Sequence, residues 1–448
     1  MKNRNIILAT ILFALASFAL PQGTQAVVPA SPDTALAGGN TADGNLALGG
    51  LTTGIYNSGF GIFALLSNGA ANFNTGVGAG ALLVNTADSN TATGAGALLS
   101  NTTGPDNTAN GAFALFSNTT GSFNTATGFQ ALENSTGDRN TANGADALLS
   151  NTTGAENTAD GNNALRNNTS GGPNTAVGAE ALSSNTTGAD NTAIGWSALF
   201  SNTTGTFNTA TGFQALENST GDRNTANGAD ALLSNTSGIQ NTADGNNALR
   251  NNVSGSGNVA LGAEAASGVT TANNVICIGA NVAGNDVDNS CYIGNIFGDT
   301  SSGGTAVFVN SNGRLGTTTS SRRFKDSIKP MDQASEALFA LKPVTFRYKK
   351  EVDPQRIPQF GLVAEEVEKV NRDLVVHDKE GKPYSVRYEQ VNAMLLNEFL
   401  KEHNTVQELR KELGALTATV KDQAVQIEKV SARLEVSKPA TKVVLNNP

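Results

Sequence analysis

The chain has few of the side chains that fill an ordinary globular core or bind metals. Aromatic residues make up 6% of its 448 residues, and it contains one tryptophan, two cysteines and two histidines. With His377 and His403 as its only histidines, we expect neither a metal site nor a cofactor. A chain poor in aromatics and rich in glycine (49 residues) forms either a disordered tract or a thin repetitive structure.

Lysine is absent between Lys2 and Lys325. Residues 27–299 carry 19 acidic and 4 basic side chains, whereas residues 300–448 carry 19 acidic and 23 basic ones. An acidic, lysine-free body argues against binding to nucleic acid or to anionic membranes.

Long hydrophobic runs are absent after the N-terminus. Lys2 and Arg4 precede the apolar run from Ile6 to Leu20, and small residues follow up to Ala26. We predict a signal peptide over residues 1–26, then a linker over 27–39, and a secreted or cell-surface protein without a stable membrane span once the leader is removed. An uncleaved anchor is the alternative.

The two cysteines lie in related segments that each contain an Ile-Gly pair, at Ile278-Gly279 and Ile293-Gly294. Aligning these pairs puts Cys291 opposite Ile276 and not opposite Cys277. If both segments are strands, the thiols face opposite sides, so we predict two free or interchain thiols rather than a bond within one chain.

The pattern N-T-A-x-G-x-x-A-L recurs through the first two thirds of the chain. Its 14 copies are spaced by 16 or 17 residues, and only the last lacks the Ala-Leu pair, having Ala265-Ala266. Residues 124–166 are nearly restated at 208–250, which indicates duplication of a block of repeats. The first Asn of each copy is Asn40, Asn57, Asn74, Asn90, Asn107, Asn124, Asn140, Asn157, Asn174, Asn191, Asn208, Asn224, Asn241 and Asn258.

A fixed short period predicts stacked units of one kind. Seventeen residues suit one coil of a parallel β-roll, with two short strands joined by turns rich in Asn, Thr and Gly. The Leu column would form a thin apolar core, and the Asn column an amide ladder. We predict a mainly β chain, with a β-roll of 14 repeats and two degenerate coils over residues 40–298. A disordered low-complexity tract is the alternative.

Over roughly residues 40–295 the repeats resemble the YadA-like head repeats of trimeric autotransporter adhesins. The resemblance rests on N-T-A-x-G and on the later Ile-Gly segments, although the period here is longer. It implies a homotrimer with a surface-binding role, whose ligand is a surface glycan or a host-cell receptor. Within the repeats, we expect Trp196, Phe129 and Phe213 to serve packing rather than sugar binding.

After residue 298 the composition becomes ordinary and charged. Residues 299–319 are predicted to be a linker with a hairpin that turns at Asn312-Gly313. Alternating and periodic apolar residues then predict a small α+β domain, with helices at Ala334–Leu341 and Ala364–Val370 and strands at Val344–Tyr348, Phe360–Val363, Leu374–His377 and Tyr384–Val386.

From about Tyr388 to Leu434 the pattern is helical. Apolar residues step by three and four positions, and Gln423 fills the one polar slot, which predicts a coiled coil over residues 391–436 and a tail over 437–448. An amphipathic helix packed on its own domain is the alternative. The apolar positions are Val406, Leu409, Leu413, Leu416, Val420, Ile427, Val430 and Leu434.

Three ordered motifs, Ser320–Lys325, Phe360–Val367 and Tyr384–Tyr388, precede this helix. Together with it they resemble the endosialidase-type intramolecular chaperone domain of phage tailspikes and tail fibres, which is also found in myelin regulatory factor. The resemblance covers about 320–434 and implies a chaperone peptidase domain over 320–390 with a trimeric coiled coil.

In that family a Ser and a Lys five residues later form a self-cleaving dyad. The resemblance assigns these roles to Ser320 and Lys325, the family's Arg to Arg323, and the scissile bond to Thr319–Ser320. Attack requires Lys325 to be neutral, which burial beside neighbouring cations would favour. Ser321 stands where the family usually has Asp, which weakens the expectation of cleavage.

These features predict a secreted or surface trimeric fibre whose C-terminal domain is an intramolecular trimerisation chaperone and cleaves itself off before Ser320. It would be a Ser/Lys endopeptidase that acts once, on its own chain. One alternative is a non-cleaving structural or adhesive fibre in which the domain stays as a permanent trimer clasp. The other is a glycan-degrading fibre, for which the repeats offer no distinct carboxylate pair.

Overall fold

A computed structural model describes residues 36–298 and 301–437. The chain divides into two compact units between residues 299 and 300. The predicted signal peptide over 1–26 lies outside the described residues, as do most of the linker over 27–39 and most of the tail. Within the described ranges, no helix is long and apolar enough to cross a membrane.

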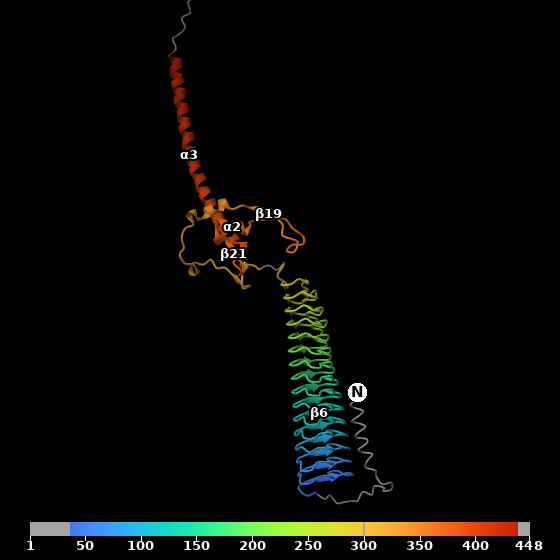
Figure 1. Ribbon diagram of the computed structural model, residues 1–448. Helices are drawn as coiled ribbons and strands as arrows, with labels where there is room; N and C mark the ends of the chain where they lie inside the picture. The colour runs from blue at the N-terminus through green and yellow to red at the C-terminus, as the bar shows by residue number, and fades with distance from the viewer. Residues whose placement is uncertain (1–35, 299–300, 438–448) are drawn as a thin grey trace, which may run out of the picture. The chain divides into compact units, whose positions relative to one another are not determined.

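The N-terminal unit is a parallel β-roll in which sixteen strands, β1 to β16, stack in sequence order (Figure 1). Equivalent residues lie side by side, as where Thr158 pairs with Thr175 and Ala159 with Ala176. The strands are Thr41–Asp43, Ser58–Phe60, Thr75–Val77, Thr91–Thr93, Thr108–Asn110, Thr125–Thr127, Thr141–Asn143, Thr158–Asp160, Thr175–Val177, Thr192–Ile194, Thr209–Thr211, Thr225–Asn227, Thr242–Asp244, Val259–Leu261, Ile276–Ile278 and Cys291–Ile293.

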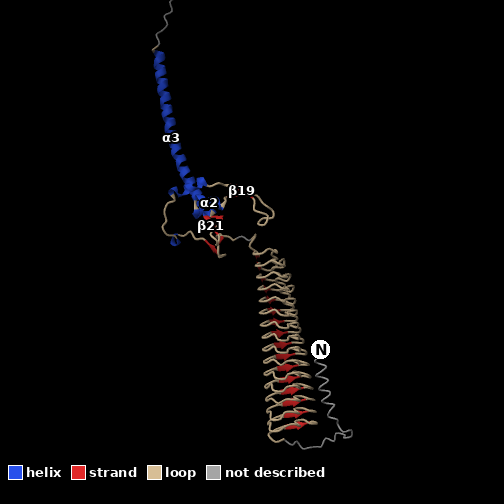
Figure 2. Cartoon of the chain, in the orientation of Figure 1, coloured by secondary structure: helices blue, strands red, loops and turns tan. Residues whose placement is uncertain are grey.

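The predicted β-roll is confirmed, with one correction to the structure of its coils. Across residues 36–298 each coil contains one three-residue strand rather than two, and turns complete it (Figure 2). The reason is a backbone with positive φ on the other side of the coil, as at Asn163 (φ 58°) and Leu165 (φ 51°). Such residues cannot lie in a strand, and each costs about 1–2 kcal/mol for a residue other than glycine.

The core of the roll consists of stacked leucines and alanines. Twelve leucines, from Leu65 to Leu249, are fully buried. Two columns of alanines pack beside them, one in the strands, as at Ala159, and one just before each leucine, as at Ala164. The backbone of this column is also paired between coils, since the Leu165 N–H donates to the Ala181 carbonyl at 3.0 Å. The predicted thin apolar core is therefore present.

The predicted amide ladder is present as well. The backbone N–H of Asn174 donates to Asn157 Oδ1 (3.0 Å), and Asn174 Nδ2 donates to the Gly188 carbonyl (2.9 Å). A second buried column, which the sequence pattern did not single out, runs parallel to it: Asn168 Nδ2 donates to Asn151 Oδ1 at 2.8 Å. These two ladders satisfy polar groups that a thin core would otherwise leave unpaired.

The last two coils confirm the prediction for the cysteines. Cys291 pairs with Ile276, so it lies out of register with Cys277. Both thiols are free; Cys277 is buried in the core, and Cys291 is exposed. Burial raises the pKa of the Cys277 thiol, so this group stays an inert apolar filler.

The C-terminal unit begins with the predicted hairpin and ends in one long helix. Its small core comprises Val367, Leu374, Val375, Val386, Val391 and Met394. Figure 1 shows α3 running out from this domain as a single continuous rod. The elements are β17 (Val307–Val309), β18 (Leu315–Thr317), the 3-10 helices η1 (Arg322–Phe324), η2 (Asp332–Ala340) and η3 (Arg372–Leu374), β19 (Val344–Phe346), β20 (Gln359–Gly361), α2 (Ala364–Val370), β21 (Val375–His377), β22 (Pro383–Val386) and α3 (Tyr388–Val436).

Candidate functional site

The predicted dyad lies on a single tight turn. The 3-10 helix η1 is closed by hydrogen bonds from the Phe324 N–H to the Ser321 carbonyl (3.0 Å) and from the Lys325 N–H to the Arg322 carbonyl (3.1 Å). This turn folds the chain back so that Lys325 Nζ donates to Ser320 Oγ at 3.2 Å. The spacing of five residues therefore places an amine beside a hydroxyl, as a nucleophile and its base require.

The surroundings of the dyad are open. Ser320 and Lys325 are both exposed, so one chain does not supply the burial that would favour a neutral lysine. Within the described residues, no donor is hydrogen-bonded to the Thr319 carbonyl oxygen, which would carry the developing charge. A single chain thus brings the predicted nucleophile and base together, and its described residues supply no oxyanion hole around them.

The two neighbours of the dyad do not complete it. The Arg323 guanidinium lies over the Phe324 ring, 4.6 Å from its centroid. Ser321 is the N-terminal cap residue of η1, but its side chain makes no capping hydrogen bond. An Asp at this position would bring a carboxylate, a good cap and a counter-charge, to a segment that here is purely cationic.

The other two predicted motifs meet each other. The Leu362 N–H donates to Tyr388 Oη at 3.0 Å, which joins the Phe360–Val367 segment to the start of α3. Gly361 permits this approach, since a Cβ there would lie 2.8 Å from Tyr388 Oη and 3.2 Å from the Phe346 ring. No hydrogen bond or ion pair among the described residues links either motif to the dyad segment.

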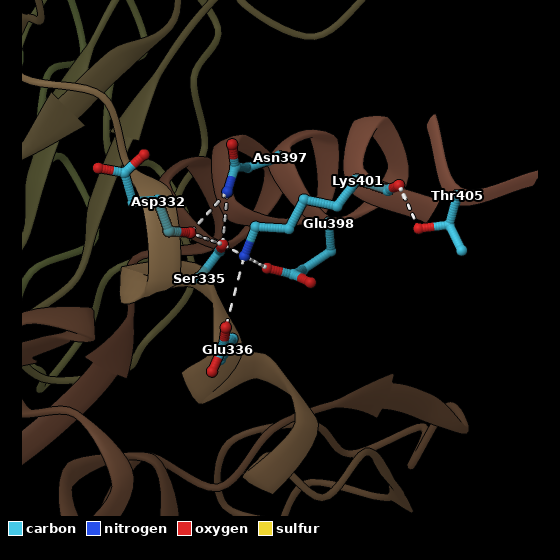
Figure 3. Close-up of polar contacts among 7 residues, drawn as sticks. All are labelled: Asp332, Ser335, Glu336, Asn397, Glu398, Lys401 and Thr405. Atoms are coloured by element: carbon cyan, nitrogen blue, oxygen red, sulfur yellow. Dashed lines mark hydrogen bonds and ion pairs between the residues drawn. The ribbon is translucent and has the colours of Figure 1, made fainter. Parts of the chain in front are cut away.

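A polar cluster that the sequence analysis missed fixes η2 to α3 (Figure 3). The buried Ser335 hydroxyl donates to Glu398 Oε1 and accepts from Asn397 Nδ2 (2.6 Å), which also donates to the Asp332 carbonyl (3.1 Å). Lys401 Nζ donates to Glu398 Oε1 at 2.7 Å. The residues of η2 lie 62 to 65 positions from their partners on α3, so no local sequence pattern reveals these contacts.

The charges of this cluster reinforce each other. The hydrogen bond from Lys401 and the one from Ser335 lower the pKa of Glu398, and the bond to Glu398 raises the pKa of Lys401. Both groups therefore stay charged at neutral pH. The cluster holds the base of α3 against the domain at a fixed angle, which is a positioning role rather than a chemical one.

Two other features of the chain lie apart from the predicted dyad. A pocket of about 300 Å³ between the end of η2 and α2 is lined by Leu341, Leu362 and Val367, among others, and contains neither dyad residue.

On the roll, the Trp196 ring stacks on Phe213 of the next coil with centroids 5.1 Å apart. The two rings therefore pack on each other, and both remain half exposed.

Comparison with known families bears on the C-terminal unit alone. Residues 320–376 match the model of the family described as chaperone of endosialidase, Peptidase_S74. No curated protein and no solved structure matches the chain. The matched segment begins at the predicted nucleophile, includes Lys325 and the Phe360–Val367 motif, and ends before β22. Downstream of its β-roll the chain therefore carries a segment, residues 320–376, that is similar to chaperone of endosialidase domains.

Proposed function

We propose that this chain is one third of an exported, surface or secreted fibre, and that its C-terminal domain assembles the trimer and then cleaves itself off before Ser320. The observation that carries the proposal is the exposed seam of α3. Leu413 is 63% exposed and Ile427 66%, and along 49 residues only Val391 and Met394 are buried. An apolar stripe of this length at heptad spacing is typical of a coiled coil. The family match favours three strands.

The strained backbone of the roll explains why assembly needs a template. Each coil contains several non-glycine residues with positive φ, and only stacking on the next coil compensates this strain. Its stabilising contacts join residues 16 or 17 positions apart, so an isolated coil has little to hold it. A trimer formed first through α3 would hold three chains in register while the coils stack.

The proposed cleavage is an acyl shift followed by hydrolysis. Ser320 Oγ attacks the Thr319 carbonyl carbon, and a neutral Lys325 takes the hydroxyl proton. The proton passes to the Ser320 nitrogen as the C–N bond breaks, which leaves an ester. Water then hydrolyses the ester, giving a Thr319 carboxylate and a free Ser320 hydroxyl.

Coupling of this reaction to assembly follows from the exposure of the dyad. Because one chain leaves Ser320 and Lys325 exposed, neighbouring chains would have to desolvate the lysine and supply the oxyanion donors. Cleavage would then occur only after the trimer has formed. Removal of the template would leave the stacked fibre kinetically trapped.

Intact-mass measurement of the exported product tests the proposal. We expect two fragments, 27–319 and 320–448, from the native chain. Ser320→Ala should give an uncut trimer, whereas Ser321→Ala, the matched neighbour, should still be cut. A cut Ser320→Ala chain would refute the assigned nucleophile. An intact native chain would favour the permanent-clasp alternative.

A further inference from the structure

The hairpin of β17 and β18 is well formed locally. Val307 pairs with Thr317 and Val309 with Leu315. At the turn, Asn310 Oδ1 accepts from the backbone N–H groups of Asn312 and Arg314, both at 3.0 Å. The hairpin therefore presents its side chains in a fixed arrangement.

One face of the hairpin is apolar and uncovered. Val307, Val309 and Leu315 lie on the same face and are 62–65% exposed. On the other face Phe308 lies opposite Gly316, where a Cβ would meet nothing within 4 Å. A two-stranded hairpin with neither face packed is only marginally stable in water. Among the described residues nothing covers Val307, Val309 and Leu315, so the hairpin would be stabilised by a partner that covers them.

The position of the hairpin in the chain indicates which partner it takes. Between residues 300 and 321 the only charged side chain is Arg314, so a contact here would bury almost no charge. The segment joins a roll and a coiled coil that the proposed trimer holds in three copies, so three hairpins would be gathered together. It also ends two residues before the proposed scissile bond.

We propose that the three hairpins of the trimer pack on one another through Val307, Val309 and Leu315. This contact, here called the clasp and distinct from the C-terminal domain, would hold the three chains of the processed fibre together. The inference rests on the proposed function, since it requires a trimer. The inference goes beyond the proposed function by naming the contact that replaces α3 in holding the three chains together. Cleavage removes the coiled coil but leaves the hairpins on the body, at the end where α3 held the chains together.

The test separates the clasp from the template. The hairpin variant carries Val307→Thr, Val309→Thr and Leu315→Thr, because threonine keeps the preference for strands and removes the apolar contact. The control carries Val177→Thr and Ile194→Thr, two exposed strand residues of the roll at positions where other coils have Thr. Each is made in the native chain and in a Ser320→Ala chain with a protease site inserted after Thr319, so that the body can be released in either case.

Mass is measured by light scattering over a hundredfold dilution, before and after removal of 320–448. We expect trimers of every uncut chain, trimers of the native and control bodies, and at least a tenfold loss of trimer for the hairpin variant only after the cut. A trimeric body of the hairpin variant would overturn the clasp, as would a native body that dissociates. If the uncut Ser320→Ala chain is itself monomeric, the proposed function fails instead.

Discussion

The roll and the C-terminal unit use the same apolar residue in opposite ways. Leu165 is fully buried within its own chain, and its neighbours one coil away are leucines in the same position. Leu413 is 63% exposed on α3. Both units follow a strict apolar period, of 16–17 residues in one and three to four in the other. A period therefore shows that a column exists, but not whether the chain or another copy covers it.

The largest expected effect is at the glycine that recurs in every repeat. Gly144 has φ +137°, and a Cβ there would lie 2.5 Å from the carbonyl oxygen of Gly161 in the next coil. Gly144→Ala should destabilise the roll by about 4 kcal/mol or more, because backbone strain adds to a clash that only separation of the coils relieves. Urea unfolding of the uncut Ser320→Ala protein, followed by circular dichroism, measures this loss.

Gly80 is the matched control for that substitution. It also has positive φ (+68°), but a Cβ there meets only Leu99 Cδ1 at 3.5 Å, and equivalent positions in other coils carry Asn163 or Asp146. Gly80→Asn should therefore leave stability nearly unchanged. Equal effects at the two glycines would show that the close stacking of coils is not what limits the roll.

The second test makes one substitution in both units. Leu165→Ala should cost about 3 kcal/mol of unfolding free energy, since it leaves a cavity in a core that cannot collapse around it. Leu413→Ala should leave the unfolding of the roll unchanged and weaken the proposed trimer, because in that trimer its side chain, 63% exposed in the single chain, would meet only the other chains. Urea unfolding and light scattering on the uncut protein distinguish the two effects. Similar unfolding curves for both variants would mean that α3 packs on its own chain.

The sequence pattern was enough to predict the stacking of coils but not their internal shape. The register of Thr, Ala, Leu and Asn follows directly from the period, and so does the offset of Cys277 from Cys291. The prediction of a second strand in each coil was wrong. In that part of the coil, residues other than glycine, such as Leu165 and Glu156, have a positive φ that a strand does not allow. At positions such as that of Glu156 the residue type varies from coil to coil, so residue type alone does not predict the positive φ.

In the candidate site, too, some features could be predicted from the sequence and others could not. The pairing of Ser320 with Lys325 was assigned from a family resemblance, because a Ser and a Lys five residues apart carry little information alone; in the structure one turn brings the two side chains together. Burial of the lysine could not be judged from the sequence, since desolvation depends on which surfaces surround a group. The cluster of Ser335, Asn397 and Glu398 was also out of reach, because it depends on how η2 packs against α3.

The smallest expected effect concerns the end of the roll, where stacking stops. Backbone N–H groups of one turn donate to carbonyls of the next coil, as Val253 does to Thr270 (2.7 Å). The backbone N–H of Thr270 donates instead to the side chain of Asp286. Asp286 Oδ1 accepts from the backbone N–H groups of Thr270, Thr271 and Ala272 at 2.7–2.9 Å. The hydrogen bond from the Thr270 hydroxyl, followed by these backbone bonds, holds the pKa of Asp286 far below its usual range.

A folded pKa below the unfolded value means that this cap stabilises the roll above about pH 4 and is lost as the pH falls toward the folded pKa. Asp286→Asn should speed amide exchange at Thr270 and Ala272 at neutral pH by roughly tenfold, the local counterpart of about 1.4 kcal/mol. Glu264→Gln, an exposed change one coil away, should not. Because the carboxylate is itself exposed, solvent limits its contribution, and coils further along the roll should keep their protection. Faster exchange throughout the roll would show instead that the coils unfold as one unit, and that the end of the stack governs the stability of the whole.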